Sequence, residues 1–154
     1  MILLVHLLFG AAVASKIQNP VFAIVLAFLS HYLLDLIPHT EYNIENIRKK
    51  QWNKSFIDIF KIAFDFFVGI LLILLFSNPP TGLGQPIIFI AAFFAILPDG
   101  LTVLGYFLKI KFLELHKKFH QKKIHFLKDK KISVFWRITS QAIIIIISIF
   151  LLSN

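Results

Sequence analysis

The sequence predicts an all-α integral membrane protein, a bundle of five transmembrane helices with one basic amphipathic helix on the cytoplasmic side. Hydrophobic residues make up 58% of the 154-residue chain and charged residues only 16%, whereas an ordinary soluble domain has about 45–50% and 25%. A soluble fold of this length could not bury so much apolar surface. Because the length suits one domain, we expect a single membrane domain over residues 1–154.

Five apolar stretches are the expected spans. A spanning helix needs about 20 residues, within a range of about 17–25. The last three stretches meet this length, whereas the first two are short and would need a locally thinner bilayer. The expected helices cover residues 1–15, 21–37, 56–76, 87–108 and 132–152.

The first stretch has an alternative interpretation, because Ala12-Val13-Ala14 resembles a signal-peptidase site. A signal peptide begins with a positively charged region, and nothing basic precedes Lys16. We therefore expect a retained helix, with a cleaved signal as the alternative.

The basic residues predict the orientation of the chain. The connections 38–55 and 109–131 are both basic and are separated by two crossings, so they must lie on the same side of the membrane. The connection 77–86 carries no charge. The positive-inside rule then predicts a protein of the cytoplasmic membrane with its N-terminus inside and its C-terminus outside.

Residues 109–131 predict an amphipathic helix on the inner leaflet. Phe112, Leu115 and Phe119 recur at helical spacing among nine lysines. Such a helix places lysines against anionic lipid headgroups; the alternative is that the lysines only set topology and solubility. The interleaved Phe and Leu residues favour a membrane surface, so we expect no nucleic-acid binding. The lysines expected at the headgroups are Lys117, Lys118, Lys122 and Lys123.

Ionisable residues interrupt the apolar stretches. An Asp at the centre of a spanning helix costs about 2.5–3.5 kcal/mol, so something must offset that cost. In the segment SHYLLDLIPH, His31, Asp35 and His39 follow one another at four-residue spacing and therefore share a helix face. Asp99 lies between Pro98 and Gly100, which predicts a kink that directs its carboxylate into the bundle.

These residues all fall at one expected depth, which predicts a metal site. At about 1.5 Å per residue, the His and acidic residues of the spans lie in the inner half of the bundle. His116 and His120 have the HxxxH spacing that lets two imidazoles reach one ion. Imidazoles and carboxylates suit Zn²⁺, with Mn²⁺ or Fe²⁺ as alternatives. Because the inventory exceeds four ligands, two ions sharing a carboxylate also fit.

The expected ligands fall into two groups. The first choice is His31, Asp35, Asp99, His116 and His120, and the second is His6, His39 and Asp65. Asp65 is also the expected catalytic carboxylate, acting as a general base. Taken singly, His6 could instead be a hydrogen-bonded core histidine, and Asp65 could pair with Lys61. His125 has the pattern of a surface residue.

Four short motifs resemble known metal proteins. VHLLFGAA, LPD and the downstream histidine pair resemble the inner-membrane metal-dependent hydrolase family once described as LexA-binding. SHYLLDLIPH is more loosely similar to the metal-binding helices of zinc-dependent phospholipase C. The resemblance implies a metal-dependent hydrolase in which His6, Asp99, His116 and His120 are the matching polar positions. The chain has HKKFHQ and a lone Asp99 where the family has a His-Arg-Gly-x-Thr-His-Ser stretch and a paired acidic motif.

Together these patterns predict a membrane-embedded metal-dependent hydrolase acting on a lipid or other phosphoester at the cytoplasmic face. The first alternative is a metal or proton carrier, which would need polar groups through the full depth of the membrane. The second alternative is a non-enzymatic adaptor that binds lipid through its basic helix.

Overall fold

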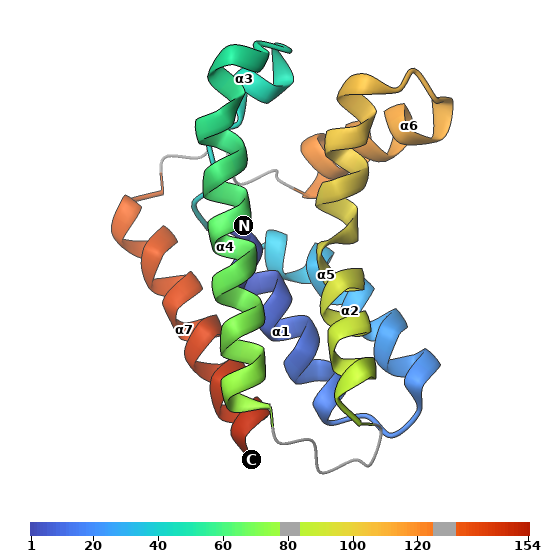
Figure 1. Ribbon diagram of the computed structural model, residues 1–154, viewed down its shortest axis with the longest axis vertical. Coiled ribbons are helices and arrows are strands. Elements are labelled where there is room, and N and C mark those ends of the chain that lie inside the picture. The colour runs from blue at the N-terminus through green and yellow to red at the C-terminus, as the bar shows by residue number, and fades with distance from the viewer. Residues whose placement is uncertain (78–83, 125–131) are drawn as a thin grey trace.

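The computed structural model describes residues 1–77, 84–124 and 132–154, and the regular structure in these ranges is helical throughout. Figure 1 shows the helices as a bundle in which the chain passes repeatedly between two ends. In chain order the elements are α1 (Leu3–Ser15), α2 (Pro20–Asp35), α3 (Glu45–Arg48), α4 (Trp52–Phe76), α5 (Gly84–Phe107), α6 (Lys111–Phe119), the π-helical turn η1 (His120–Ile124) and α7 (Val134–Ser153).

Three helices are long and apolar enough to cross a membrane: Trp52–Phe76, Pro86–Phe107 and Val134–Ser153. They indicate insertion into a membrane, so the prediction of an all-helical membrane protein is confirmed to this extent. The finer prediction of five spanning helices is not confirmed, because α1 and α2 have only 13 and 16 residues.

Helix α1 lies in the centre of the bundle, where it packs against α2, α4, α5 and α7 (Figure 1). Small side chains permit this close approach. A Cβ added to Gly10 would lie 2.4 Å from the Cβ of Ala95 on α5, and one added to Gly69 of α4 would lie 2.7 Å from Leu7. Small residues at helix contacts are typical of membrane bundles. An apolar helix this short is typical of a buried core element, which explains the short first stretch of the sequence.

Helix α2 has clear local signals at both ends. The side chain of Asn19 accepts a hydrogen bond from the backbone N–H of Phe22, and Pro20 occupies the first helical turn. The helix ends at Asp35, three residues before Pro38, a residue that disfavours helical geometry in the position before it. Two metal-ligand candidates, His31 and Asp35, therefore lie in the last turns of α2.

The described parts of the two basic connections, which contain α3 and α6, lie at the same end of the molecule. In Figure 1, α3 and α6 are at the top, whereas the C-terminus is at the bottom. This agrees with the expectation that the basic connections share a side; which side faces the cytoplasm stays a prediction. Residues 78–83 and 125–131, which include His125, lie outside the described residues.

The start of the expected amphipathic segment packs against the end of α5. Lys117 donates a hydrogen bond to the carbonyl oxygen of Gly105 at 2.9 Å, and its ammonium lies 5.1 Å from the ring centre of Tyr106. A lysine in this position satisfies a carbonyl in the last turn of a helix. Lys118 and Lys122 are exposed, and headgroup binding by these lysines stays a prediction. The side chain of Lys123 lies outside the described part of the chain.

Candidate metal centre

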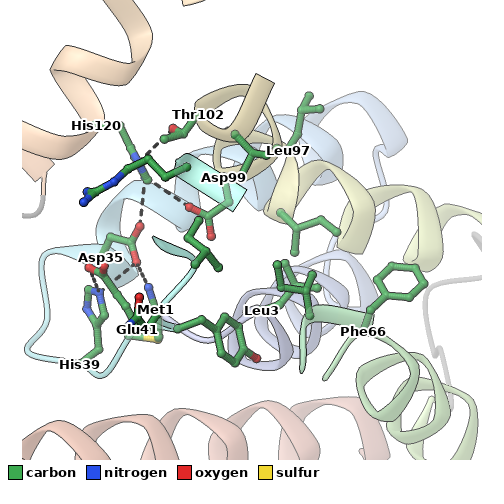
Figure 2. Close-up of a pocket in the computed structure, with 18 of the residues that line it drawn as sticks. Met1, Leu3, Asp35, His39, Glu41, Phe66, Leu97, Asp99, Thr102 and His120 are labelled. Atoms are coloured by element: carbon green, nitrogen blue, oxygen red, sulfur yellow. Dashed lines mark hydrogen bonds and ion pairs between the residues drawn. The ribbon is translucent and has the colours of Figure 1, made fainter. Parts of the chain in front are cut away.

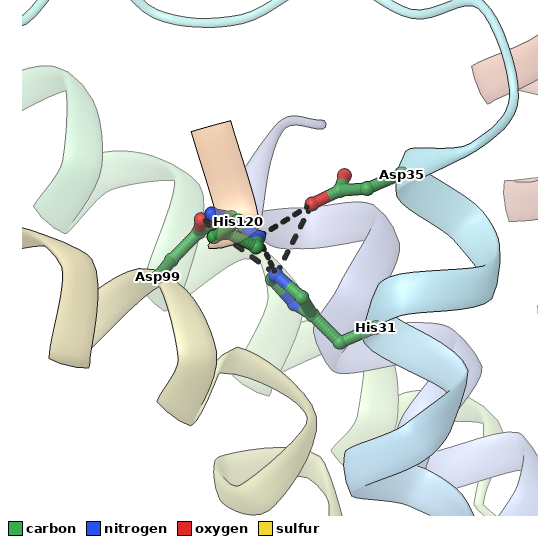
Figure 3. A group of neighbouring side chains, drawn as sticks. All are labelled: His31, Asp35, Asp99 and His120. Carbon is green, nitrogen blue, oxygen red and sulfur yellow. Dashed lines mark hydrogen bonds and ion pairs between the residues drawn. The ribbon is translucent and has the colours of Figure 1, made fainter. Parts of the chain in front are cut away.

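Four side chains from three elements converge beside the N-terminal end of α1 (Figure 3). His31 and Asp35 come from α2, Asp99 from α5 and His120 from the first residue of η1. One ligand atom from each lies within 4.8 Å of all the others, and three of the four residues are buried. These side chains can therefore hold a metal ion.

Three of the ligand atoms form a tight triangle. His31 Nε2 lies 3.0 Å from His120 Nε2, and each of these atoms lies 3.1 Å from Asp35 Oδ2. Neighbouring ligand atoms around a tetrahedral Zn²⁺ are about 3.3 Å apart, because the bonds are about 2.0–2.1 Å long. The triangle is thus close to the spacing that a bound ion requires.

Asp99 is the fourth member of the group. Its Oδ1 lies 3.7 Å from His31 Nε2 and 4.0 Å from His120 Nε2, and its side chain is 32% exposed. Asp99 is therefore the most accessible of the four candidates.

The outer nitrogen of His31 is held by the backbone of α5. Nδ1 lies 2.8 Å from the carbonyl oxygen of Ala95. Because a carbonyl can only accept, Nδ1 carries a hydrogen, so in the neutral imidazole the lone pair is on Nε2. A backbone carbonyl of α5 therefore orients the imidazole.

His120 is oriented in a similar way by Thr102. The Thr102 hydroxyl donates to the carbonyl oxygen of Pro98 at 3.0 Å, so its oxygen is free to accept from His120 Nδ1 at 3.3 Å. In the neutral form, His120 then has its lone pair on Nε2, which faces Nε2 of His31 beside a carboxylate. A metal ion, or a proton on one of the two imidazoles, can join three atoms at this separation. Such hydrogen bonds to the outer nitrogen of a histidine are typical of metal sites.

His6 lies on the other side of Asp35. Its Nε2 is 3.2 Å from Asp35 Oδ1 and its ring stacks on His31 with 4.0 Å between centroids. The side chain is fully buried, yet neither ring nitrogen makes a hydrogen bond of good geometry. His6 therefore contacts the carboxylate of a candidate ligand, and its role as a ligand or as a core histidine stays a prediction.

His39 also faces Asp35 Oδ1, from the loop that follows α2. Its Nε2 lies 3.7 Å from that oxygen and 3.4 Å from Glu41 Oε1, and its Nδ1 lies 2.6 Å from the carbonyl oxygen of Ile37. The amino nitrogen of Met1 is 2.8 Å from the same Asp35 oxygen. His6 and His39 thus adjoin the four-residue group without belonging to it.

His116 points to a different partner. Its Nε2 lies 3.0 Å from the Tyr32 hydroxyl, and its ring is 5.7 Å from that of His120. Burial, and secondarily the neighbouring His120, hold the pKa of His116 below its usual range. The HxxxH spacing predicts that both imidazoles reach one ion, but the structure brings only His120 into the four-residue group.

Asp65 caps the start of α1. Its Oδ2 accepts a hydrogen bond from the backbone N–H of Leu4 at 2.7 Å, which satisfies a free donor in the first turn and complements the helix dipole. The expected catalytic carboxylate therefore has a structural contact outside the four-residue group. Its role as a general base stays a prediction.

A cavity of about 1270 Å³ opens beside the cluster. Figure 2 shows Asp35, His39, Asp99, Thr102 and His120 towards one side of it, and Leu3, Phe66 and Leu97 towards the other. The cavity is thus polar at the cluster and apolar away from it.

Sequence reasoning missed the residues that orient the ligands. Thr102 lies one turn after Asp99 and is a polar residue in an apolar helix, which is the one available signal. The contact of His31 with the Ala95 carbonyl and of His116 with Tyr32 has no signal in the sequence, because both pairs are more than 60 residues apart.

No protein-family model, no curated protein and no solved structure matches this chain. The family resemblance of the four short motifs therefore stays a prediction.

Proposed function

We propose that this protein is a membrane-embedded metal-dependent hydrolase of phosphoesters that binds Zn²⁺ through His31, Asp35, Asp99 and His120. Mn²⁺ and Fe²⁺ are the alternative ions on ligand type. The observation that carries the proposal is the triangle of two Nε2 atoms and one carboxylate oxygen, with 3.0–3.1 Å sides. The outer nitrogens of both histidines are already hydrogen-bonded, as an inward-facing ligand requires.

Zn²⁺ in such a site would act as a Lewis acid and lower the pKa of water, which is the chemistry that phosphoester hydrolysis needs. The protein itself contributes the remaining functions. Arg48 and Arg137 line the cavity beside the cluster, and guanidinium groups bind phosphate oxygens through paired hydrogen bonds.

A second ion is the finer form of this proposal. Asp35 Oδ2 faces His31 and His120, while Oδ1 faces His6 and His39. A carboxylate shared in this way is the arrangement of two-metal hydrolytic sites. The amino nitrogen of Met1, 2.8 Å from Oδ1, would be displaced by a second ion. The ring nitrogens of His6, which lack hydrogen bonds, support this extension.

The packing of the bundle favours hydrolysis over transport. A carrier would need a polar path from the cluster to the other end of the molecule. In that direction α1, α2 and α5 close on an apolar core that includes Leu8, Ala12, Ala27, Ala91 and Ile88. The buried hydroxyls of Ser15 on α1 and Ser30 on α2 each donate to a carbonyl of their own helix, so they do not form a relay for a cation.

The test is metal analysis of detergent-purified protein, performed alongside hydrolysis of bis(p-nitrophenyl) phosphate. We expect stoichiometric Zn²⁺ and turnover in the wild type, with both lost in Asp35→Ala and His120→Ala. Loss of a residue that hydrogen-bonds to a ligand typically lowers metal affinity about 10–100-fold. Removing a ligand itself should lower the affinity for Zn²⁺ by more than this. The proposal fails if the wild type neither retains Zn²⁺ nor rebinds it after dialysis.

Asp58→Asn is the matched control for this experiment. Asp58, near the start of α4, is also a buried carboxylate. It accepts hydrogen bonds from the backbone N–H and the side-chain amide of Asn46 in α3. We expect Asp58→Asn to keep both metal and activity. Circular dichroism and gel filtration establish that each variant is folded.

A further inference from the structure

The cavity beside the cluster runs between two candidate membrane spans, α4 and α5. Its apolar wall is made of two facing helix stripes, each with the three- and four-residue spacing of one helix face. The α4 stripe contains Ile59, Ile62, Ala63, Phe66 and Phe67. The α5 stripe contains Phe93, Ile96, Leu97, Gly100, Val103 and Leu104.

The two stripes do not close on one another. Helices α4 and α5 each pack against α1, and within the described residues they make at most marginal contact with each other. Large apolar side chains at the rim are exposed: Ile59 by 51%, Phe67 by 69% and Phe93 by 55%. In a membrane these rims would meet hydrocarbon, so the cavity is open sideways to the acyl chains of the bilayer.

The other end of the cavity suits an anionic headgroup. His120 and Asp99 of the metal-binding group line it, together with Arg48 and Arg137. Arg48 is 54% exposed and lies 3.9 Å from Glu45, a loose pair that a phosphate could replace. A bound divalent ion and a guanidinium both attract phosphate oxygens.

The size of the cavity also excludes a small polar ester as the best-fitting occupant. Its volume of about 1270 Å³ exceeds the about 300–1,000 Å³ typical of small-molecule pockets. A ligand that fills it must present phosphate at one end and a long apolar body along the two stripes.

We propose that the substrate is a phospholipid that reaches the metal centre laterally, through the gap between α4 and α5. Its headgroup phosphate lies at Asp99 and His120, and an acyl chain lies along the facing stripes. Hydrolysis would break a P–O bond and form a P–OH bond with water, and the proton would pass to the departing alcohol. The hydrolytic step rests on the proposed function, whereas the binding of lipid in the gap does not.

Gly100 offers a way to block the gap without disturbing its walls. It lines the cavity, and a Cβ added there would meet no heavy atom within 4 Å. Gly100→Phe should therefore fold and place a ring in the path of the acyl chain. Ala63→Phe fills the gap from the opposite wall. Ala142→Phe, on the exposed face of α7, is the matched control.

The binding test uses phosphatidylglycerol with a diazirine in its acyl chain, in vesicles of phosphatidylcholine and phosphatidylglycerol. After photolysis, mass spectrometry locates the adducts. We expect adducts on both stripes in the wild type and Ala142→Phe, and their loss in Gly100→Phe and Ala63→Phe. Adducts confined to the outer faces of α4 and α7, unchanged in all variants, would overturn the proposal.

Two activity measurements separate this proposal from the hydrolase itself. Because one misfitting methylene in an apolar pocket can change specificity about tenfold or more, Gly100→Phe should lose at least that factor with phosphatidylglycerol. It should keep its Zn²⁺ and its activity on bis(p-nitrophenyl) phosphate. Equal loss on both substrates, with Zn²⁺ retained, overturns lateral access. Stripe adducts in a protein that hydrolyses neither substrate uphold lipid binding and overturn the hydrolase.

Discussion

The two oxygens of Asp35 face two differently built groups of histidines. Oδ2 faces His31 and His120, whose Nδ1 atoms are held by the carbonyl of Ala95 and the hydroxyl of Thr102. Oδ1 faces His6, whose ring nitrogens make no hydrogen bond, and His39. His39 lies in the loop after α2, where its Nδ1 is 2.6 Å from the carbonyl oxygen of Ile37, two residues away.

This difference shows on which side of Asp35 the fold already holds the histidine rings in place. On the Oδ2 side, the supporting groups come from α5, so two helices and a π-helical turn must move together before the ligands separate. On the Oδ1 side, the ring nitrogens of His6 make no hydrogen bond of good geometry, and His39 lies in a loop. Sites on rigid elements with supported ligands bind more precisely than sites on loops. We therefore expect the Oδ2 side to bind the first ion.

The sharpest test compares His31→Ala with His6→Ala. Both residues are fully buried and stack on each other, so the two variants leave similar cavities and differ in ligand role. We expect His31→Ala to lower Zn²⁺ affinity by more than about 100-fold, because a ligand contributes more to the affinity than a residue that only hydrogen-bonds to a ligand. His6→Ala should lower the Zn²⁺ affinity by less than about tenfold.

Competition titration with a chromophoric chelator measures both affinities. If Asp35 bridges two ions, His6→Ala lowers the stoichiometry from two to one while the tighter ion remains. Equal losses of affinity in the two variants would contradict the distinction between the two sides of Asp35.

A weaker effect is expected at Thr102, which positions His120 without reaching the ion. Thr102→Val keeps the shape and removes the hydroxyl, so His120 Nδ1 loses its acceptor. Loss of such a partner typically lowers metal affinity about 10–100-fold. Thr102→Ser should restore most of the affinity, because it restores the oxygen.

Ser148→Ala is the control for Thr102→Val. Ser148 is also buried, and its hydroxyl likewise donates to a carbonyl four residues earlier, Ile144, but no histidine accompanies it. The measurement is the same chelator titration. An unchanged affinity in Thr102→Val would show that Thr102 does not orient His120.

Local patterns in the sequence were enough to predict the helices and one ligand pair. The apolar stretches 56–76 and 132–152 correspond to α4 (Trp52–Phe76) and α7 (Val134–Ser153), because helix length in a bilayer follows from hydrophobicity alone. The four-residue spacing of His31 and Asp35 predicts a shared face, and their ligand atoms lie 3.1 Å apart.

Contacts between distant segments could not be predicted in this way. Composition does not distinguish a helix exposed to lipid from one surrounded by protein. The sequence alone therefore could not predict that α1 is buried in the centre of the bundle. Asp65 shows the same limit. The sequence predicts a general base or metal ligand, or a pair with Lys61, but Asp65 caps the first turn of α1 by accepting a hydrogen bond from Leu4.

The smallest effect is expected at His116. The HxxxH spacing predicts that this residue binds the ion, whereas the observed geometry directs it to another partner. Its Nε2 contacts Tyr32, and burial holds its pKa below the usual range. Because a lowered pKa keeps the imidazole neutral at pH 7, His116→Ala removes no charge beside the cluster. We expect unchanged Zn²⁺ affinity at pH 7, and the same result for Tyr32→Phe. A loss as large as that of His120→Ala would show that both histidines of the motif bind the ion, and would place the metal nearer α6 than the triangle around Asp35.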